Sequence, residues 1–266
     1  MLKIILVAAL MSYLISSFGF WMYLFTKKRT GTKLGFSFFG IGFLIQLIYI
    51  GLRDFQEKTF AVATHQELPF FLAFLIAVVY YGLSLRYHKK LKDFGSIFAP
   101  INVFLIAMTL PNVGEKSLTY ENFWFHAHVI FSMVAYAFII ASTVVAVIYL
   151  LTHRDLKRKK LDSFFVSKFS SSLALLEDVE YKSTILAFVS LSLALISSSV
   201  WSSVYLGKHW LWELKQIALS LLWVFYGFLI HIRVIKHEKG KKAAYLTILG
   251  GFAAFIVYWF IKHPAY

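Results

Sequence analysis

Eight apolar runs constrain the fold of this chain more than any other feature. They lie at about residues 4–25, 34–52, 69–85, 95–110, 124–151, 184–206, 216–235 and 243–261. An α-helix needs about 20 residues to cross the hydrocarbon of a bilayer, and a helix pairs its backbone polar groups within one segment. The sequence therefore predicts an all-α, polytopic membrane bundle of about eight transmembrane helices. Only 15% of the residues are charged, against about a quarter in soluble domains, so a soluble fold is excluded.

The basic residues set the predicted orientation. Of the 27 Lys and Arg residues, 20 fall in four connections between alternate runs, at residues 27–33, 86–92, 154–182 and 233–242. Lys and Arg in short loops mark the cytoplasmic side. Both termini are therefore expected on the outer, periplasmic or extracellular, side of the cell membrane. A nucleic-acid partner is excluded, because its basic residues would gather in one patch; membrane lipid is the expected surrounding.

No soluble domain fits between the runs, so residues 1–266 are expected to form a single membrane domain. Four spans fall in residues 1–120 and four in residues 121–266. The longest connection, at residues 153–183, reads as a solvated linker with an amphipathic helix lying on the membrane surface. The chain has no cysteine, which excludes a thiol relay and thiolate metal sites, so any cofactor is held noncovalently.

Histidines are unusually frequent for so apolar a chain, which has nine. His126 and His128 open the fifth run, and at two residues' spacing their side chains point about 200° apart on a helix. His128 begins a stripe of small and polar residues with Ser132, Ala135 and Tyr136. This pattern favours His128 as the histidine that faces the interior of the bundle.

A second unusual segment, VWSSVYLGKHWLWELKQ, connects the sixth and seventh runs on the predicted outer side. Its tryptophans are typical of an aromatic belt at the membrane boundary. The alternative is a platform for a flat, anionic, amphiphilic ligand, with indole faces covering the plane and lysines pairing the carboxylates. Haem fits such a platform, since its iron takes neutral imidazole as an axial ligand. The candidate residues are Trp201, Trp210, Trp212, Lys208 and Lys215, with His128 and the C-terminal His263 as ligands from two sides.

These residues resemble those of the cytochrome c assembly family of haem-handling membrane proteins (CcsA/ResC/HemX-like). The family's outer loop reads WGxYWxWDPKE, the WWD motif, and is similar to LGKHWLWELKQ here, which keeps Gly207, Trp210, Trp212 and Lys215. Trp201 matches the tryptophan that precedes the loop. The resemblance covers about the C-terminal 145 residues.

Three histidines also match family motifs. HVIFSMVAYA is similar to the family's HVxxxxLSYA, and KHPAY to its HSY. The resemblance thus implies that His128 and His263 are the outer axial ligands of a noncovalent haem b. GFLIHIRV is similar to YLHxR, which implies that His231 belongs to an inner haem site.

The resemblance implies a membrane protein of cytochrome c maturation that transports or delivers haem to the outer face. It implies a second membrane protein as partner, apocytochrome c as a recipient, and no enzyme activity by this chain alone outside a haem-attachment system. The loop departs from the motif at Leu206, Glu213, Leu214 and Gln216, which is typical of the shorter HemX-like branch. The alternative is therefore a regulatory or scaffolding protein of haem biosynthesis. A solute transporter is disfavoured, because no charged residue lies near the middle of a run.

Overall fold

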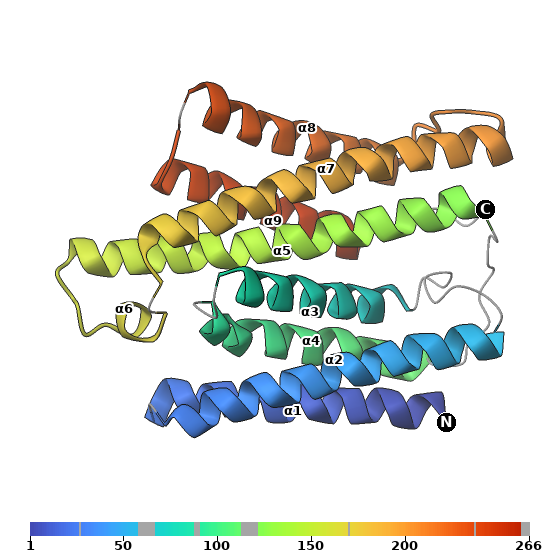
Figure 1. Cartoon of the computed structure of the whole chain (residues 1–266). Coiled ribbons are helices and arrows are strands. Elements are labelled where there is room, and N and C mark those ends of the chain that lie inside the picture. Colours follow the sequence, from blue (N-terminus) through green and yellow to red (C-terminus); the bar gives the residue numbers. More distant parts are fainter. Residues whose placement is uncertain are drawn as a thin grey trace. The chain divides into compact units, whose positions relative to one another are not determined.

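The computed structural model describes residues 1–26, 28–57, 67–87, 91–112, 122–169, 171–236 and 238–261, and these are helical with no strand among them (Figure 1). The elements in chain order are α1 (Leu2–Thr26), α2 (Arg29–Glu57), α3 (Leu68–Arg86), the 3-10 turn η1 (Lys92–Phe94), α4 (Gly95–Thr109), the 3-10 turn η2 (Leu110–Asn112), α5 (Phe123–Lys157), α6 (Phe164–Lys168), α7 (Leu173–Leu206), α8 (Leu214–Ile235) and α9 (Lys241–Phe260).

The predicted polytopic helical bundle is confirmed. Seven described helices are long and apolar enough to cross a membrane, namely α1, α2, α3, α5, α7, α8 and α9. The fourth predicted run corresponds to α4, which has 15 residues and is shorter than the usual membrane-spanning length of about 20. The orientation of the termini stays a prediction.

The prediction for residues 153–183 is wrong. The structure extends α5 to Lys157 and begins α7 at Leu173, and among the described residues between them the one helix, α6, has five residues. The Ser172 hydroxyl caps α7 by accepting from the amide of Leu175 at 3.2 Å. Its first turns contain Glu180, which is buried and bonded to Arg233 of α8 and Thr247 of α9. These partners compensate the buried charge, and residues 173–183 are therefore part of the bundle helix α7 and not of a solvated linker.

The described contacts separate into two compact units. Unit 1 comprises residues 1–121 and 167–171, and unit 2 comprises residues 122–166 and 172–266. Each unit is described by itself below.

Unit 1 is built on a close contact between α1 and α2, which lie side by side (Figure 1). A Cβ atom on Gly19 would lie 2.6 Å from the amide nitrogen of Gly35, so the two backbones touch at these glycines. Such small residues let membrane helices approach closely. Tyrosine hydroxyls add ties between helices, as in the 2.6 Å bond from Tyr13 to the Gln46 side chain.

Residues 167–171 complete one end of unit 1, although they follow α5 in the chain. The ring of Phe169 packs edge-on against Phe94 with centroids 5.2 Å apart, and the Lys168 ammonium lies 5.9 Å from the centre of the Tyr23 ring. Both Lys168 and Phe169 are buried. The connection after α5 is therefore part of the packing of unit 1.

Unit 2 is a four-helix arrangement in which α5 packs on α7 and α9, and α8 packs on the same two helices. At Gly251 a Cβ would overlap the Thr143 side chain, so α9 passes close to α5. The Glu180 carboxylate joins three helices by bonding to Arg233 and Thr247. Both ends of this bundle carry the groups considered below.

Candidate functional site

The loop between α7 and α8, residues 207–213, is folded back onto the end of α7; we call it the tryptophan loop. Gly207 ends α7 with φ at 66°, in the left-handed region that favours glycine. The hydroxyl of Ser202 donates to the carbonyl of Lys208 at 2.5 Å, and the Gln216 side chain accepts from the amide of Leu211 at 2.9 Å. The loop is thus held from α7 on one side and α8 on the other.

His128 lies in the second turn of α5 and is tied to α7. Its Nδ1 is 2.9 Å from the carbonyl oxygen of Ala194. A carbonyl only accepts hydrogen bonds, so Nδ1 carries the proton and Nε2 of the neutral ring keeps its lone pair. A ligand histidine that donates its other N–H to a backbone carbonyl is the usual arrangement at metal sites, because that bond fixes the tautomer and the ring orientation.

A small cavity of about 40 Å³ lies beside His128. It is walled by α7, the tryptophan loop and the start of α8, through Leu195, Ser198, Trp201, Ser202, Leu211, Glu213, Gln216 and Leu219. This volume holds a few water molecules and is far too small for a porphyrin. A flat macrocycle therefore has to lie along the open edge of this site, unless the loop moves.

Trp201 forms the aromatic part of the cavity wall. Its indole is 5.8 Å from the ring of Phe125 and stacks 6.2 Å from that of Tyr205. Glu213 lines the same cavity, and burial raises the pKa of its carboxyl. The site thus places an aromatic face and a carboxyl group near the imidazole of His128.

Trp210 and Trp212 present their indoles outward. Their rings meet edge to face at 5.7 Å, and Trp212 is 77% exposed. Trp212 also adopts a positive φ of 55°, which a bulky residue rarely does. Exposed aromatic faces held in this way suit a planar apolar surface, as the platform hypothesis requires. Lys208, in the same loop, is exposed.

Lys215 was expected to pair a haem propionate, but in the structure its ammonium is bonded within the protein. It is buried, and its ammonium donates to the carbonyls of Val257 at 3.0 Å and Ile261 at 2.6 Å, at the end of α9. It therefore ties the start of α8 to the end of α9. His263, two residues further on, lies outside the described residues.

His231 does not join this cluster. It is exposed on α8, 16 residues beyond Lys215 and so about 24 Å along the helix. Within the described parts of the chain, no group of three or more His, Asp or Glu side chains is arranged to hold a metal ion.

The structure thus gathers His128, Trp201 and the tryptophan loop at one end of unit 2. Sequence reasoning missed the contributions of Ala194, Ser198, Ser202 and Gln216. For Ser198 and Ser202 the available signal was the run of serines near the end of α7, SSSVWSS at residues 197–203, since hydroxyls can hold a returning loop; the sequence carries no comparable signal for Ala194 and Gln216.

Comparison with known proteins extends the resemblance. The family described as "Cytochrome C assembly protein" matches residues 5–264. The "Cytochrome c biogenesis protein CcsA" of Guillardia theta is 24% identical over 270 residues, which cover 94% of this chain and 88% of that protein. The protein of the same name from Prochlorococcus marinus is 26% identical over 223 residues (75% and 72%), and that from Chlamydomonas reinhardtii 24% over 234 residues (83% and 62%). The match is not confined to the C-terminal 145 residues but includes the first four helices, and the chain belongs to the cytochrome c assembly protein family.

Proposed function

We propose that this chain is a multi-pass protein of the cell membrane that acts in cytochrome c maturation by holding haem at the outer face for delivery. The family and the names of its relatives support the pathway. The single observation that supports haem binding is the bond from His128 Nδ1 to the Ala194 carbonyl, which leaves the lone pair of Nε2 available to a metal. The alternative role in regulating haem biosynthesis is not favoured, because these relatives are named for cytochrome c biogenesis.

The chain's own residues would position the haem. Haem, the iron-porphyrin that is later attached to the apocytochrome, is the cargo of this protein. Nε2 of His128 and the imidazole of His263, two residues beyond Ile261 in the sequence, would hold the haem iron. Trp210 and Trp212 would cover the exposed part of the ring, and Lys208 is the lysine free to pair a propionate.

Lys215 would act indirectly. Its ammonium already holds two carbonyls at the end of α9, and these lie directly before the segment with His263. We therefore assign it to positioning that segment, and not to the propionate. His231, far along α8, would belong to a separate inner haem position if one is used.

A partner would complete the reaction. Attachment of haem to an apocytochrome uses thiols, and this chain has no cysteine. A second membrane protein would therefore supply thiol handling and recruit apocytochrome c. The chain acts within such an assembly and is not proposed to be an enzyme by itself.

The test is the visible spectrum of the protein purified from haem-replete cells. Wild type is expected to show a Soret band. His128→Gly is expected to lose most of it, and added imidazole to restore it by occupying the vacated axial position. The matched control is His153→Gly, near the far end of α5, with an unchanged spectrum. A missing Soret band in wild type, or an unchanged one in His128→Gly, would refute the assignment.

The orientation is tested separately by labelling. Because the chain lacks cysteine, single cysteines report without background. A membrane-impermeant maleimide on intact cells should label Lys208→Cys and leave Lys159→Cys unlabelled until the cells are opened. The reverse pattern would place the tryptophan loop in the cytoplasm and remove the outer haem site.

A further inference from the structure

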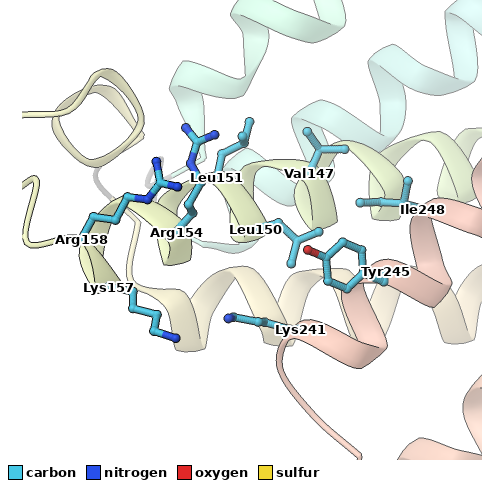
Figure 2. A pocket seen from close by; sticks show the side chains of 9 residues that line it. All are labelled: Val147, Leu150, Leu151, Arg154, Lys157, Arg158, Lys241, Tyr245 and Ile248. Atoms are coloured by element: carbon cyan, nitrogen blue, oxygen red, sulfur yellow. The ribbon is translucent and has the colours of Figure 1, made fainter.

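A second, larger pocket lies between α5 and α9 at the end of unit 2 opposite the tryptophan loop (Figure 2). Its volume is about 630 Å³, within the range of small-molecule sites. Four cationic side chains line it, namely Arg154 and Lys157 of α5, Arg158 directly after that helix, and Lys241 of α9. We call it the basic pocket. None of the residues proposed to hold haem lines it.

Few carboxylates offset this charge. Asp155 is bonded to Arg154 at 3.1 Å, and Glu238 is bonded to Lys242 outside the pocket at 3.2 Å. Within the described residues, Lys157, Arg158 and Lys241 have no carboxylate within ion-pair distance. These three cations line one space, and a concave space lined by one sign of charge attracts anions.

The pocket is polar at one end only. Figure 2 shows the charged side chains gathered toward one end and Val147 and Ile248 at the other, with the Tyr245 hydroxyl pointing into the space between. The sequence of α5 agrees with this separation of apolar and charged ends, because Val147 lies about 16 Å along the helix axis from Arg158. The apolar end is formed by residues within the apolar part of each helix, so the polar end of the pocket lies toward the charged ends of α5 and α9.

A free anion would use only the charged end of such a pocket. An amphiphile with a phosphate headgroup and an acyl chain would use both ends, with phosphate at the cations and chain against Val147, Leu150 and Ile248. The cations lie in the connections predicted to be cytoplasmic, and basic pockets between helices on that side bind anionic lipid headgroups. Arginine adds paired N–H donors suited to phosphate oxygens.

We propose that the basic pocket binds an anionic phospholipid, with its phosphate between Lys157, Arg158 and Lys241 and one acyl chain along the apolar wall. The site is independent of the haem assignment. It would hold α5 and α9 together at the end opposite the tryptophan loop.

The experiment titrates the purified full-length protein, in detergent, with phosphatidylglycerol and counts bound lipid by native mass spectrometry. Phosphatidylcholine serves as the zwitterionic comparison. The test variant is Lys157→Gln/Arg158→Gln/Lys241→Gln. The matched control is Lys159→Gln/Lys160→Gln/Lys239→Gln, which removes three charges from the same connections, at residues that do not line the pocket.

Wild type and control are expected to retain one phosphatidylglycerol, in preference to phosphatidylcholine. The test variant should bind it about 100-fold more weakly, since each cation near an anionic headgroup contributes about fivefold. Equal losses in both triple variants would mean diffuse attraction and overturn the proposal. Displacement of the lipid by millimolar inorganic phosphate would also overturn it, because it would show a free-phosphate site. Retention without headgroup preference would do the same.

Folding and haem are controlled in the same samples. Thermal unfolding shows whether the test variant is intact, and the milder variant Lys241→Gln, expected to weaken binding about fivefold, serves if the triple variant unfolds. An unchanged Soret band in a variant that has lost lipid separates this site from the haem site. Loss of lipid therefore cannot be mistaken for failure of the haem assignment.

Discussion

The two units differ in the contacts that bring their best-joined helices together. In unit 1 the backbones of α1 and α2 touch at Gly19 and Gly35. In unit 2 charged side chains bridge helices, since Glu180 joins three of them and Lys215 joins α8 to the end of α9. Both pockets described above belong to unit 2. Unit 2 also has a close contact at a glycine, where Gly251 of α9 meets Thr143 of α5, and the basic pocket opens beyond it, toward Arg154 and Lys241. A glycine contact therefore closes the space between two helices only locally, and the cavity lies where the same helices carry long polar side chains.

The largest effect is expected from breaking the charged bridge of unit 2. Glu180→Ala leaves the guanidinium of Arg233 buried without its carboxylate, and we expect a loss of about 3–5 kcal/mol in the free energy of unfolding. Chemical unfolding in detergent measures it. Glu180→Met/Arg233→Met should recover most of the loss, because no charge is then left buried. The control is Asp178→Ala, whose pair with Lys182 is exposed and contributes less than about 0.5 kcal/mol.

The glycine contact of unit 1 is tested by replacing Gly19 with a larger residue. In Gly19→Val the new side chain would meet the backbone of Gly35, which is part of a helix and does not move aside. We expect a loss of about 3 kcal/mol, at the upper end of usual overpacking effects. Gly82→Val adds the same atoms at a position where, beyond its own stretch of helix, no described heavy atom lies within 4 Å of the new Cβ. If both variants lose the same amount, the close contact does not stabilise unit 1 and the comparison fails.

The second bridge of unit 2 distinguishes positioning from ligand contact. Lys215→Met removes two bonds to the end of α9, and we expect about 2 kcal/mol less stability even in haem-free protein. For the exposed Lys208 we expect the opposite pattern: Lys208→Met should keep the free energy of unfolding of wild type but retain haem more weakly. Should Lys215→Met unfold like wild type and still lose haem, Lys215 would be the propionate partner after all.

The smallest effect is a pH dependence in unit 1. Burial raises the pKa of the Asp93 carboxyl in η1 from its ordinary value of 3.8 to about 6, although Lys92 and Lys168 oppose the shift. The folded state therefore holds this proton at pH values where the unfolded state has lost it, and stability falls as pH rises from about 4 to about 6. Partial exposure of the side chain limits the change to about 1 kcal/mol.

Asp93→Asn checks this window. The variant has no proton to lose, so its unfolding free energy should change less between pH 4.5 and 7 than that of wild type. An identical pH dependence in both proteins would show that the Asp93 carboxyl is as solvated when folded as when unfolded.

The sequence was sufficient for the helices and for the orientation of His128. Apolar length located seven helices long enough to span the membrane and a shorter eighth, α4, because the membrane imposes that length. The stripe of small residues predicted that His128 faces the interior, and in the structure its ring contacts Ala194 of α7. The partners that decide the rest lie far along the chain. Glu180 bonds to residues 53 and 67 positions away, which is why the early start of α7 was missed.

The same limit applies to the candidate site. The burial of Lys215 depends on carbonyls 42 and 46 residues later, and the tautomer of His128 on Ala194, 66 residues later. Local spacing predicts which face a side chain takes, but the chemical state of that side chain is set by the groups across from it.

The five residues that complete unit 1 also impose an order of assembly during synthesis. Residues 1–121 leave the ribosome first, yet Lys168 and Phe169, which pack against Tyr23 and Phe94, are made only after the whole of α5. Unit 1 therefore reaches its final packing only after the first helix of unit 2 has been synthesised. For the same reason, a gene divided between codons 121 and 122 would encode a first fragment that lacks part of its own interior.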